Sequence, residues 1–534
     1  MDENNFDVIV IGGGLLGCFA ARNLMRYDLK VALLEKREDL CTGISKANTA
    51  IVYSGCDTKP GSLKTNLCVR ASQSFSELCE QLGVRYLQCG SLMISFGERG
   101  NSVLSRKLEQ GTKNGVRGMK ILTRKEVLEL EPNISPKVSA GLFIPETGTV
   151  MPWELCLAAA ESAVRNGAEI FLSTEVTGIK RMESKDLEKR SDDGSLNIDS
   201  EFMVYTADSV FSAKAIINCA GMSADSILEL AYNPVVRIVP TAGDYFILDT
   251  KAKGHIKHVI FHEPEEKGKG LTLVPTVDGN ILVGPTERKI DLKRSEKSVS
   301  PCRESCEVNS EDKKWGNEGF ETAEDGLVLL RELVSEVIPT LPMDQVISSF
   351  GAMRPNPYMQ KQDENGTWVA DDKSVGDFCI VESEDGSFIS LVGIKTPGLT
   401  CSNELGMYIA EKTAAQLGAT PNVNFDPIRL PPIRTDELSL QEKRALVGER
   451  PEYGHVVCRC RGIAEGEVVS AIRRSPGAVT LDGIKRRTGT DSGRCQGGYC
   501  APRIIEILAR ELGISVEEVT KRGGDSWVVK YKTL

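Results

Sequence analysis

The stretch FDVIVIGGGLLGCFAARNLMRYDLKVALLEK, residues 6–36, decides the fold of the first part of the chain. It opens with a continuous apolar run over 8–11, which is typical of a strand buried on both faces. Glycines follow, and apolar residues then recur at helical spacing before a second apolar run ends at Glu35. A strand, a helix and a strand within about thirty residues predict a βαβ unit.

The glycines of this unit predict a dinucleotide site. Gly12, Gly14 and Gly17 have the spacing G-x-G-x-x-G, in which the first allows a tight turn, the second admits a pyrophosphate and the third lets the helix pack on the strand. The helix N-terminus supplies N–H groups and the positive end of a dipole. Glu35, at the end of the second strand, can accept hydrogen bonds from ribose hydroxyls. The spacing alone does not distinguish FAD from NAD, and the chain has only one such fingerprint.

Length and composition indicate a multidomain α/β protein. The 534 residues are too many for one ordinary core and suggest two to four domains. No apolar stretch is long enough to predict a membrane span. The N-terminus resembles a first strand and not a secretion signal. Together with 16 cysteines this favours a reducing compartment, and we expect a cytoplasmic protein.

The charge is unevenly distributed along the chain. From Pro451 to the end there are 14 Lys+Arg and 10 Asp+Glu, a balance of +4, so the rest of the chain carries −14 to give the total of −10. Either this is an ordinary surface fluctuation, or the C-terminal unit meets something anionic. Its arginines alternate with cysteine, glycine and apolar residues, so we expect no nucleic-acid partner.

Further αβ units are predicted around 152–179, 213–227 and 386–418, with β-rich stretches between them. The polar stretch 288–322 contains Cys302 and Cys306, which are more typical of two surface thiols than of a metal pair. A proline-rich, charged segment predicts a domain linker, which we place at 431–454.

Residues 1–430 resemble the glycerol-3-phosphate dehydrogenase and L-2-hydroxyglutarate dehydrogenase branch of the D-amino-acid-oxidase-like flavoproteins. The resemblance implies FAD and an α/β fold, in which a Rossmann-like FAD-binding domain carries a β-rich substrate domain. It places the FAD-binding parts at 1–88, 148–235 and 347–430, and the substrate-domain parts at 89–147 and 236–346. The stretches that carry it are TGISKANTAIVYSGCDTKPGSLKTNLCVRA (42–71), GTVMPWELCLAAAESAVRNGAEI (148–170), INCAGMSADSI (217–227), GAMRPNP (351–357) and GIKTPGLT (393–400).

The resemblance also implies which residues contact FAD. TGISKAN, 42–48, offers hydroxyl and amide groups suited to diphosphate and ribityl oxygens, and the amides of GIKTPGLT, 393–400, could face the flavin; an ordinary glycine turn is the alternative for the second loop. The implied cofactor residues are Gly12, Gly14, Gly17, Glu35, Thr42, Ser45, Asn48, Val176, Gly221, Gly393, Gly398, Leu399 and Thr400.

Members of this family oxidise a secondary alcohol on a small anionic substrate, with hydride passing to the flavin and a base taking the hydroxyl proton. Arg354 matches the Arg-Pro element of the family, and its guanidinium fork can hold an oxyanion. Lys395 could add a second positive charge. Of four histidines, His262 lies where the resemblance implies a pocket strand, so it is the candidate base. The alternative for Arg354 is a surface salt bridge, and the alternative for Lys395 is a solvated side chain. For His262 it is partly buried packing or a surface role.

Three departures from the family leave the substrate open. Tyr53 replaces a histidine, Cys56-Asp57-Thr58 replaces aromatic residues, and Met151 replaces an acid. The resemblance implies oxidation of sn-glycerol 3-phosphate to dihydroxyacetone phosphate. A 2-hydroxy-acid dehydrogenase of the L-2-hydroxyglutarate type, an amine or imino-acid dehydrogenase, and a non-catalytic flavin/iron–sulfur electron-transfer subunit are the alternatives.

Four cysteines form a second cofactor motif near the C-terminus. Cys458-x-Cys460 is followed by Cys495-x4-Cys500. Four thiolates suit zinc or an iron–sulfur cluster. Structural zinc pairs usually have two to four residues between ligands, so this spacing favours a cluster. A redox disulfide, or reduced cysteines that only pack in a core, would also account for the four thiols.

Residues 456–513 resemble the [2Fe–2S] domain of bacterioferritin-associated ferredoxin, which implies a small helical domain at 455–534 with these four cysteines as ligands. Cys500 would precede a helix whose apolar face is Ile504, Ile505, Leu508 and Leu512. Arg459, Arg461 and Arg494 would offset the charge of the cluster.

The two cofactors together imply an electron route. A flavin takes two electrons at once and can release them singly, and a [2Fe–2S] cluster carries one. Because a second nucleotide fingerprint is lacking, we expect the final acceptor on another protein. A flavoprotein NAD(P)H oxidoreductase subunit and a quinone-linked partner are both plausible.

Overall fold

The opening stretch forms the predicted βαβ unit: β1 (Asn5–Ile11), α1 (Leu15–Leu24) and β2 (Val31–Leu34). The computed structural model describes residues 4–182, 202–262, 270–290, 321–364 and 366–530. Cys302 and Cys306 lie outside these ranges. Strand β1 is buried on both faces, since Val8 and Val10 join one core and Ile9 and Ile11 another.

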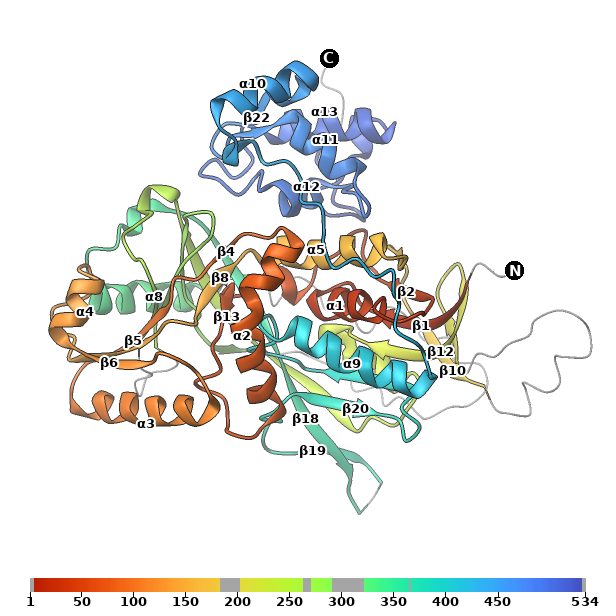
Figure 1. Cartoon of the computed structure of the whole chain (residues 1–534), viewed down its shortest axis with the longest axis horizontal. Coiled ribbons are helices and arrows are strands. Elements are labelled where there is room, and N and C mark those ends of the chain that lie inside the picture. The colour runs from red at the N-terminus through yellow and green to blue at the C-terminus, as the bar shows by residue number, and fades with distance from the viewer. Residues whose placement is uncertain (1–3, 183–201, 263–269, 291–320, 365, 531–534) are drawn as a thin grey trace, which may run out of the picture.

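The first sheet is the dinucleotide-binding scaffold (Figure 1). Strand β1 lies between β2 and β12 (Val210–Asn218), and all three are parallel. Helices α1, α5 (Pro152–Arg165) and α9 (Ser402–Leu417) pack together on one face, and α7 (Ala224–Glu229) packs against β12 and β21. The outer strands are β9 (Glu169–Phe171), β10 (Gly178–Arg181), β11 (Phe202–Tyr205), β20 (Cys379–Glu382) and β21 (Phe388–Val392).

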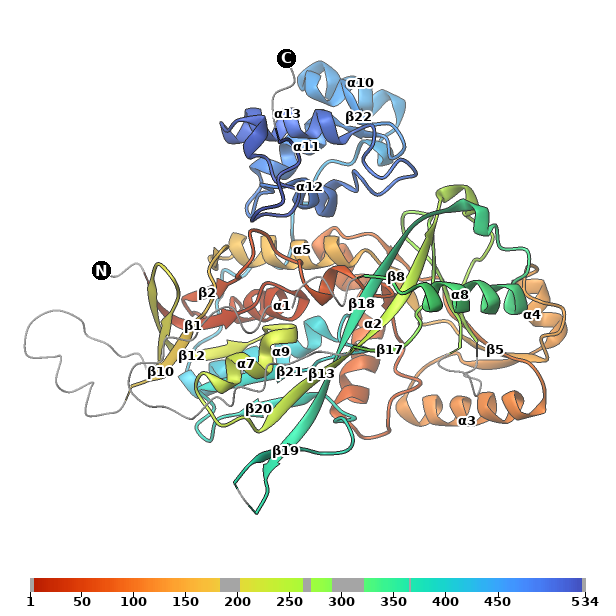
Figure 2. The ribbon, with the colours of Figure 1, turned by 180° about the vertical axis from the view of Figure 1, so that it is seen from behind.

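The second sheet forms the β-rich part, as predicted. Its longest pair is β13 (Val236–Leu248) with β18 (Val346–Gln362), which run antiparallel (Figure 2). Although the expected FAD-binding part begins at 347, β18 pairs with β13 along its length and so lies in this second sheet. The other strands are β5 (Ser91–Ser95), β6 (Lys120–Thr123), β7 (Ala140–Ile144), β14 (Val259–His262), β15 (Thr272–Pro275), β16 (Ile281–Val283), β17 (Arg288–Lys289) and β19 (Trp368–Ala370).

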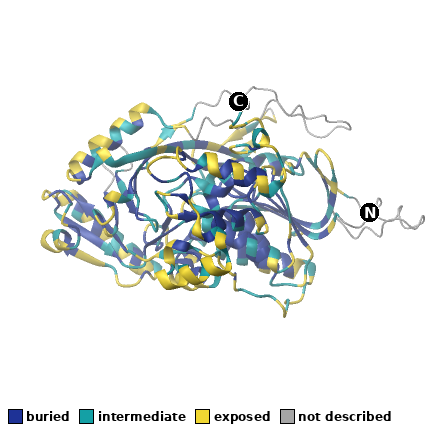
Figure 3. Cartoon of the chain, turned by 90° about the horizontal axis from the view of Figure 1, so that it is seen from above, coloured by how far each residue is buried: buried dark blue, intermediate teal, exposed yellow. Residues whose placement is uncertain are grey.

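Helices and a small sheet complete the flavoprotein body, defined here as residues 4–434. The burial is deepest in its middle (Figure 3). The second sheet is covered by α3 (Glu98–Asn114), α4 (Arg124–Leu130) and α8 (Glu324–Val337). Between the two large sheets lie α2 (Leu63–Leu82) and a three-stranded sheet of β3 (Ile51–Val52), β4 (Tyr86–Leu87) and β8 (Gly148–Val150).

The C-terminal elements form a separate group above α5 (Figure 1). They have their own apolar core, with Ile504 and Leu508 fully buried in it. The elements are α10 (Leu440–Glu449), β22 (Val456–Cys458), β23 (Ile463–Ala464), α11 (Glu465–Arg473), α12 (Leu481–Thr488) and α13 (Ala501–Leu512). We call them the cluster domain. In the described ranges, no helix of either part is both long enough and apolar enough to cross a bilayer.

The predicted linker, 431–454, holds secondary structure. Helix α10 begins at a capping box. The Ser439 side chain accepts a hydrogen bond from the Glu442 N–H, and the Glu442 side chain accepts one from the Ser439 N–H. Tyr453 is buried against Gly466, where a Cβ would overlap its ring. The extended connection instead lies earlier, where Arg429 donates to the Leu82 carbonyl on the flavoprotein body. The signal for the helix, Ser-x-x-Glu, was present in the sequence.

Candidate functional site

The glycine loop has the backbone form that a dinucleotide needs. Gly12 has a φ of 106°, and a Cβ there would lie 2.6 Å from the Cys219 carbonyl oxygen at the end of β12. A Cβ at Gly17 would overlap the Gly12 carbonyl oxygen, so the helix can approach the strand only with glycine there. Gly14 is the N-cap of α1 and brings no capping side chain. The first turn of α1 can therefore face an anion.

Two side chains hold this loop from opposite sides. Glu35 accepts from the Gly13 N–H at 2.6 Å and from the Arg37 N–H at 2.9 Å. Burial raises the pKa of Glu35, and these two backbone hydrogen bonds oppose that rise. Ser45 Oγ accepts from the Leu15 N–H at 3.0 Å, which joins the TGISKAN loop to the first turn of α1. Glu35 and Ser45, both predicted to contact FAD, thus both contact the glycine loop or the helix turn that follows it.

The structure brings the other predicted FAD segments to the same place. Tyr53 N–H donates to Thr400 Oγ1 at 2.9 Å, which joins the 42–53 segment to the 393–400 loop. Asn48 accepts from the Ala50 N–H at 2.8 Å and donates to the Ser45 carbonyl at 3.0 Å. Gly221, with a φ of 59°, faces the side chain of Ile44. The donor groups, spread over several neighbouring loops, fit a long dinucleotide such as FAD.

The remaining predicted FAD residues lie beside these loops. Val176 is buried two residues after Thr174, whose N–H donates to the Glu35 carbonyl. Gly393 has a φ of 64°, and a Cβ there would meet the ring of Pro357. The others border the same loops: Thr42, Gly398 and Leu399.

Arg354 lies on the face of β18 that meets the FAD loops. Phe350, Ala352 and Arg354 alternate along that face, and Ala352 packs with Ala47 of the TGISKAN loop. Arg354 Nη2 donates to the Thr286 carbonyl at 3.2 Å, whereas Nη1 is buried without a hydrogen-bond partner in the described residues. A buried guanidinium nitrogen in this state is suited to an anionic ligand.

Lys395 lies beside the same strand. Its Nζ donates to Asn356 Oδ1 at 3.0 Å and to Ser374 Oγ at 3.3 Å. Asn356 is two residues from Arg354 on β18 and so projects to the same face. The structure therefore brings the two predicted cations to one edge of the site.

Aromatic residues that the sequence did not reveal line this face. Tyr53 stacks on Phe261 with ring centroids 6.1 Å apart, and Tyr245 stacks on Phe350 at 4.7 Å. Burial raises the pKa of both tyrosines, so both hydroxyls are protonated at neutral pH. The sequence held one signal for Phe350. It lies four residues before Arg354, and residues an even number of positions apart on a strand point to the same face.

The structure does not place His262, the predicted base, on the face that carries Arg354. Its neighbour Phe261 faces Tyr53, whereas His262 packs edge-on against Phe96 at 5.2 Å. Successive residues of a strand point to opposite faces, so His262 lies on the side of the sheet away from Arg354. The other three histidines are also elsewhere. His255 contacts Thr340, His258 binds Glu131, and His455 lies in the cluster domain.

The four cysteines lie as two pairs in the cluster domain. Cys460 Sγ is 3.5 Å from Cys495 Sγ. The hydrogen bond with Cys500 lowers the pKa of Cys458 to about 6 and raises that of Cys500. In the ranges that the structure describes, no three potential ligands converge on a point that one metal ion could occupy. Two thiol pairs fit a cluster of two irons better than a single zinc.

The surroundings of the cysteines follow the prediction in part. Cys500 is the N-cap of α13, whose apolar residues Ile504, Ile505 and Leu508 are buried and Leu512 packs at the edge of the core. Arg459 lies over the Tyr499 ring at 4.6 Å. Arg461 and Arg494, expected to offset the cluster charge, instead form ion pairs with Asp278 and Asp249 of the flavoprotein body.

Replacing Ser45 by alanine tests the cofactor loop. The Leu15 N–H would lose its acceptor, at a cost of about 1 kcal/mol, so we expect FAD to bind about fivefold more weakly. The measurement is the Kd of FAD by titration of the apoprotein. Ser74→Ala, which removes an exposed hydroxyl on α2, is the control. Equal FAD affinity in the Ser45→Ala and Ser74→Ala proteins would contradict the role of Ser45.

Comparisons with known proteins agree with this geometry. The profile described as "FAD dependent oxidoreductase" matches residues 7–412, and that of the "BFD-like [2Fe-2S] binding domain" matches residues 456–510. The chain is 36% identical over 531 residues to "Glycerol 3-phosphate dehydrogenase" of Caloramator mitchellensis, covering 99% of each. It is 31% identical to human mitochondrial "L-2-hydroxyglutarate dehydrogenase", covering 53% of this chain and 61% of that protein.

A solved structure extends the likeness to three dimensions. The dithionite-reduced L-alpha-glycerophosphate oxidase of Mycoplasma pneumoniae, with FAD bound, matches with a TM-score of 0.65 and 25% identity. The match covers 80% of this chain and all of that one.

Proposed function

Because the chain belongs to the FAD-dependent oxidoreductases and ends in a BFD-like [2Fe-2S] binding domain, we propose that it is a dehydrogenase of sn-glycerol 3-phosphate. The product is dihydroxyacetone phosphate, and the electrons leave through the cluster to a partner protein or a quinone. The observation that carries the substrate assignment is Arg354, whose buried Nη1 has no partner in the described residues and faces the FAD loops. The full-length relative named for this substrate supports the same assignment.

The site residues have distinct roles in this proposal. Arg354 holds the phosphate by its guanidinium fork, and Lys395 adds positive charge from the neighbouring loop. The paired rings Tyr53–Phe261 and Tyr245–Phe350 exclude water from the face between them. Bound FAD supplies the acceptor for the hydride that leaves the secondary carbon.

The contacts of the four histidines lie away from the face that carries Arg354, which supports a group other than histidine as the acceptor of the hydroxyl proton. Tyr53 and Tyr245 are protonated at neutral pH because burial raises their pKa. They can therefore donate a hydrogen bond to the substrate oxygen but do not serve as ready bases.

An anaerobic substrate screen tests the assignment. We expect glycerol 3-phosphate to bleach the flavin band of the purified protein, and glycerol, which lacks the phosphate that Arg354 would bind, to leave it unchanged. Bleaching by L-2-hydroxyglutarate alone would favour the 2-hydroxy-acid alternative. A flavin that no small hydroxy compound bleaches would indicate a non-catalytic electron-transfer subunit.

The proposed partner is a separate redox protein, either a flavoprotein NAD(P)H oxidoreductase subunit or a quinone-linked acceptor. Cys495 is the exposed member of the four cysteines, which supports electron exit at that side of the cluster domain. All 14 cysteines in the described ranges are free thiols, which supports work in a reducing compartment such as the cytoplasm.

A further inference from the structure

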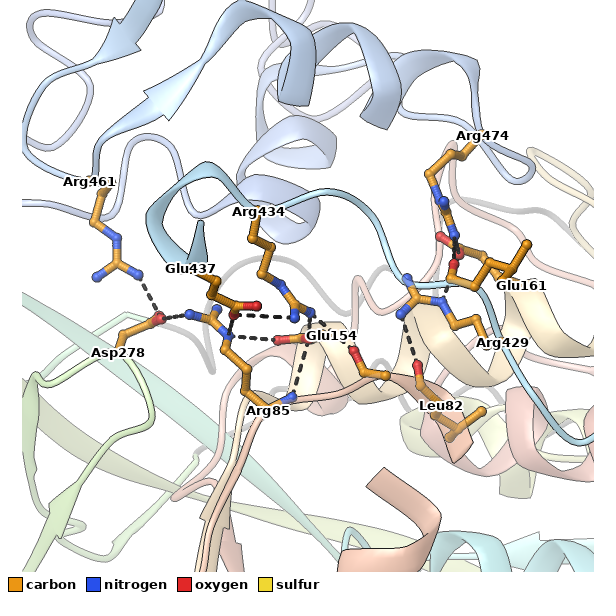
Figure 4. A network of polar contacts seen from close by, with 12 residues as sticks. Leu82, Arg85, Glu154, Glu161, Asp278, Arg429, Arg434, Glu437, Arg461 and Arg474 are labelled. Atoms are coloured by element: carbon orange, nitrogen blue, oxygen red, sulfur yellow. Dashed lines mark hydrogen bonds and ion pairs between the residues drawn. The ribbon is translucent and has the colours of Figure 1, made fainter. Parts of the chain in front are cut away.

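Arginines of the cluster domain reach across to acids of the flavoprotein body (Figure 4). The acids are nearly or fully buried, since the side chains of Asp278, Asp249 and Asp39 are 7%, 6% and 0% exposed. They therefore differ from ordinary surface pairs, which contribute little. The bridges are Arg461–Asp278, Arg494–Asp249, Arg486–Asp39, Arg487–Asp39 and Arg474–Glu161.

Two of these bridges bracket one pair of cysteines. Arg461 directly follows Cys460, and Arg494 directly precedes Cys495. Arg461 Nη2 lies 2.7 Å from Asp278, and Arg494 makes two contacts of 3.1 Å with Asp249. The Cys460–Cys495 pair is thus held to the flavoprotein body at both of its ends.

The two aspartates are themselves fixed by the body. Asp278 also binds Arg85 at 3.0 Å (Figure 4), and Asp249 accepts from the Lys251 N–H at 2.9 Å. Asp249 lies directly after β13, and Asp278 lies three residues after β15. We call these two aspartates, together with Arg461 and Arg494, the dock. Its aspartates lie just after strands of the second sheet.

A short connection joins this dock to the FAD loops. Pro275, the last residue of β15, accepts from Thr149 Oγ1 at 3.0 Å. Thr149 lies in β8, which pairs with β3, and Val150 N–H donates to the Ala50 carbonyl at 3.0 Å. Ala50 lies two residues after the predicted flavin segment 42–48. Asp278 is thus linked to that segment through three hydrogen-bonded or paired strands.

A third bridge fixes the other side of the cluster domain. Asp39 accepts from Arg487 through both oxygens at 2.8 Å and from Arg486 at 2.6 Å. Two residues on, the Cys41 N–H donates to the Gly13 carbonyl at 2.9 Å, so this bridge adjoins the glycine loop. Helix α12, which carries both arginines, packs over α5. Asp278, Asp249 and Asp39 thus hold the cluster domain to the flavoprotein body at three separate points, which fixes its orientation.

We propose that the cluster domain works docked in this position, and that Asp278 and Asp249 are positioning residues that hold the Cys460–Cys495 pair, and with it the cluster, at a fixed distance from the flavin. The proposal rests on the electron route of the proposed function. With both cofactors bound, the flavin would supply two electrons and the cluster would carry one at a time, so each turnover would need two transfers, with the acceptor re-oxidising the cluster between them. A docked domain keeps the distance between flavin and cluster the same for both transfers. A domain held only by its linker would have to return to that distance before each transfer.

The test is the Asp249→Asn/Asp278→Asn double variant. The flavin is reduced by light and a photochemical donor, and the rate of cluster reduction is followed by EPR. We expect that rate to fall at least about tenfold, with glycerol 3-phosphate still bleaching the flavin at the wild-type rate. Hydrogen exchange should rise at the dock, around residues 459–461 and 493–496.

Two further variants make the result specific. Asp249→Glu/Asp278→Glu keeps both carboxylates and should recover part of the rate. Glu511→Gln removes two ion pairs inside the cluster domain, with Arg473 and Arg510, and should leave the rate unchanged. Iron at the wild-type level in every variant establishes that the cluster domain has folded.

Wild-type rates of cluster reduction in the double asparagine variant would overturn the proposal, whatever its hydrogen exchange. If photoreduced flavin passed no electron to the cluster even in the wild type, the electron route and the docking proposal would fall together. Failure of glycerol 3-phosphate to bleach the flavin would concern the substrate alone, because light reduction does not need it.

Discussion

Replacing Arg354 by alanine is expected to lower kcat/KM for glycerol 3-phosphate by about 10³-fold, because loss of one partner of a buried charge pair costs about 4 kcal/mol. The guanidinium lies on the face that meets the FAD loops, with Nη1 buried and no partner in the described residues. Alanine leaves the phosphate without the guanidinium fork in a water-poor site, with Lys395 as the remaining cation of the proposed site. The measurement is steady-state oxidation with an artificial electron acceptor.

Two controls separate binding from folding. Arg354→Lys keeps the charge but not the fork, so it should recover only part of the activity. Lys361→Ala removes an exposed cation from the far end of the same strand and should change kcat/KM little. FAD content should stay at the wild-type level in all three. If Arg354→Ala kept kcat/KM within a factor of three of the wild type, the phosphate would have to be held elsewhere.

Local patterns in the sequence were sufficient for the FAD half of the fold. The unit β1–α1–β2 could be predicted because each signal lies within one short stretch: an apolar strand, three glycines and an acid. The loops 42–48 and 393–400 were predicted by resemblance, and the structure joins them through Tyr53 and Thr400. That contact spans 347 positions, so no local pattern could reveal it.

The sequence could not show to which face of its strand His262 points. The residue does lie on a strand of the second sheet, as expected. A strand alternates its side chains, so the neighbouring Phe261 faces the site and His262 faces the opposite core. Without knowledge of which face of a short strand is turned to the cofactor, the sequence could not decide between the two.

The docking of the cluster domain could not be predicted either. Asp39 is an acid in a short loop after β2, and its partners Arg486 and Arg487 follow more than 400 positions later. The positive balance of the C-terminal part was visible in the sequence, but it did not show what these arginines would meet. The structure shows that many of these arginines are bound to acids of the flavoprotein body, which also explains why the two parts carry opposite charge.

Removing a thiol ligand should have the second large effect. In Cys500→Ser we expect iron to fall from two per chain to a trace and the visible cluster bands to disappear, because a buried hydroxyl is a poor substitute for a thiolate on iron. Cys500 and Cys458 both lie in the core of the cluster domain, so this domain should also unfold at lower temperature. The FAD site is far along the chain from this change, so FAD content should be unchanged.

The kinetic consequence distinguishes the two cofactors. In Cys500→Ser, glycerol 3-phosphate should still bleach the flavin, while electron delivery to the natural acceptor should be lost, because the one-electron carrier between them is missing. Cys89→Ser, a half-buried thiol of the flavoprotein body, is the matched control and should keep both iron and electron delivery. Wild-type protein that held one zinc and no iron after anaerobic purification would contradict the cluster. Undiminished electron delivery in Cys500→Ser would mean that electrons leave the flavin directly, and that the dock at Asp249 and Asp278 serves stability alone.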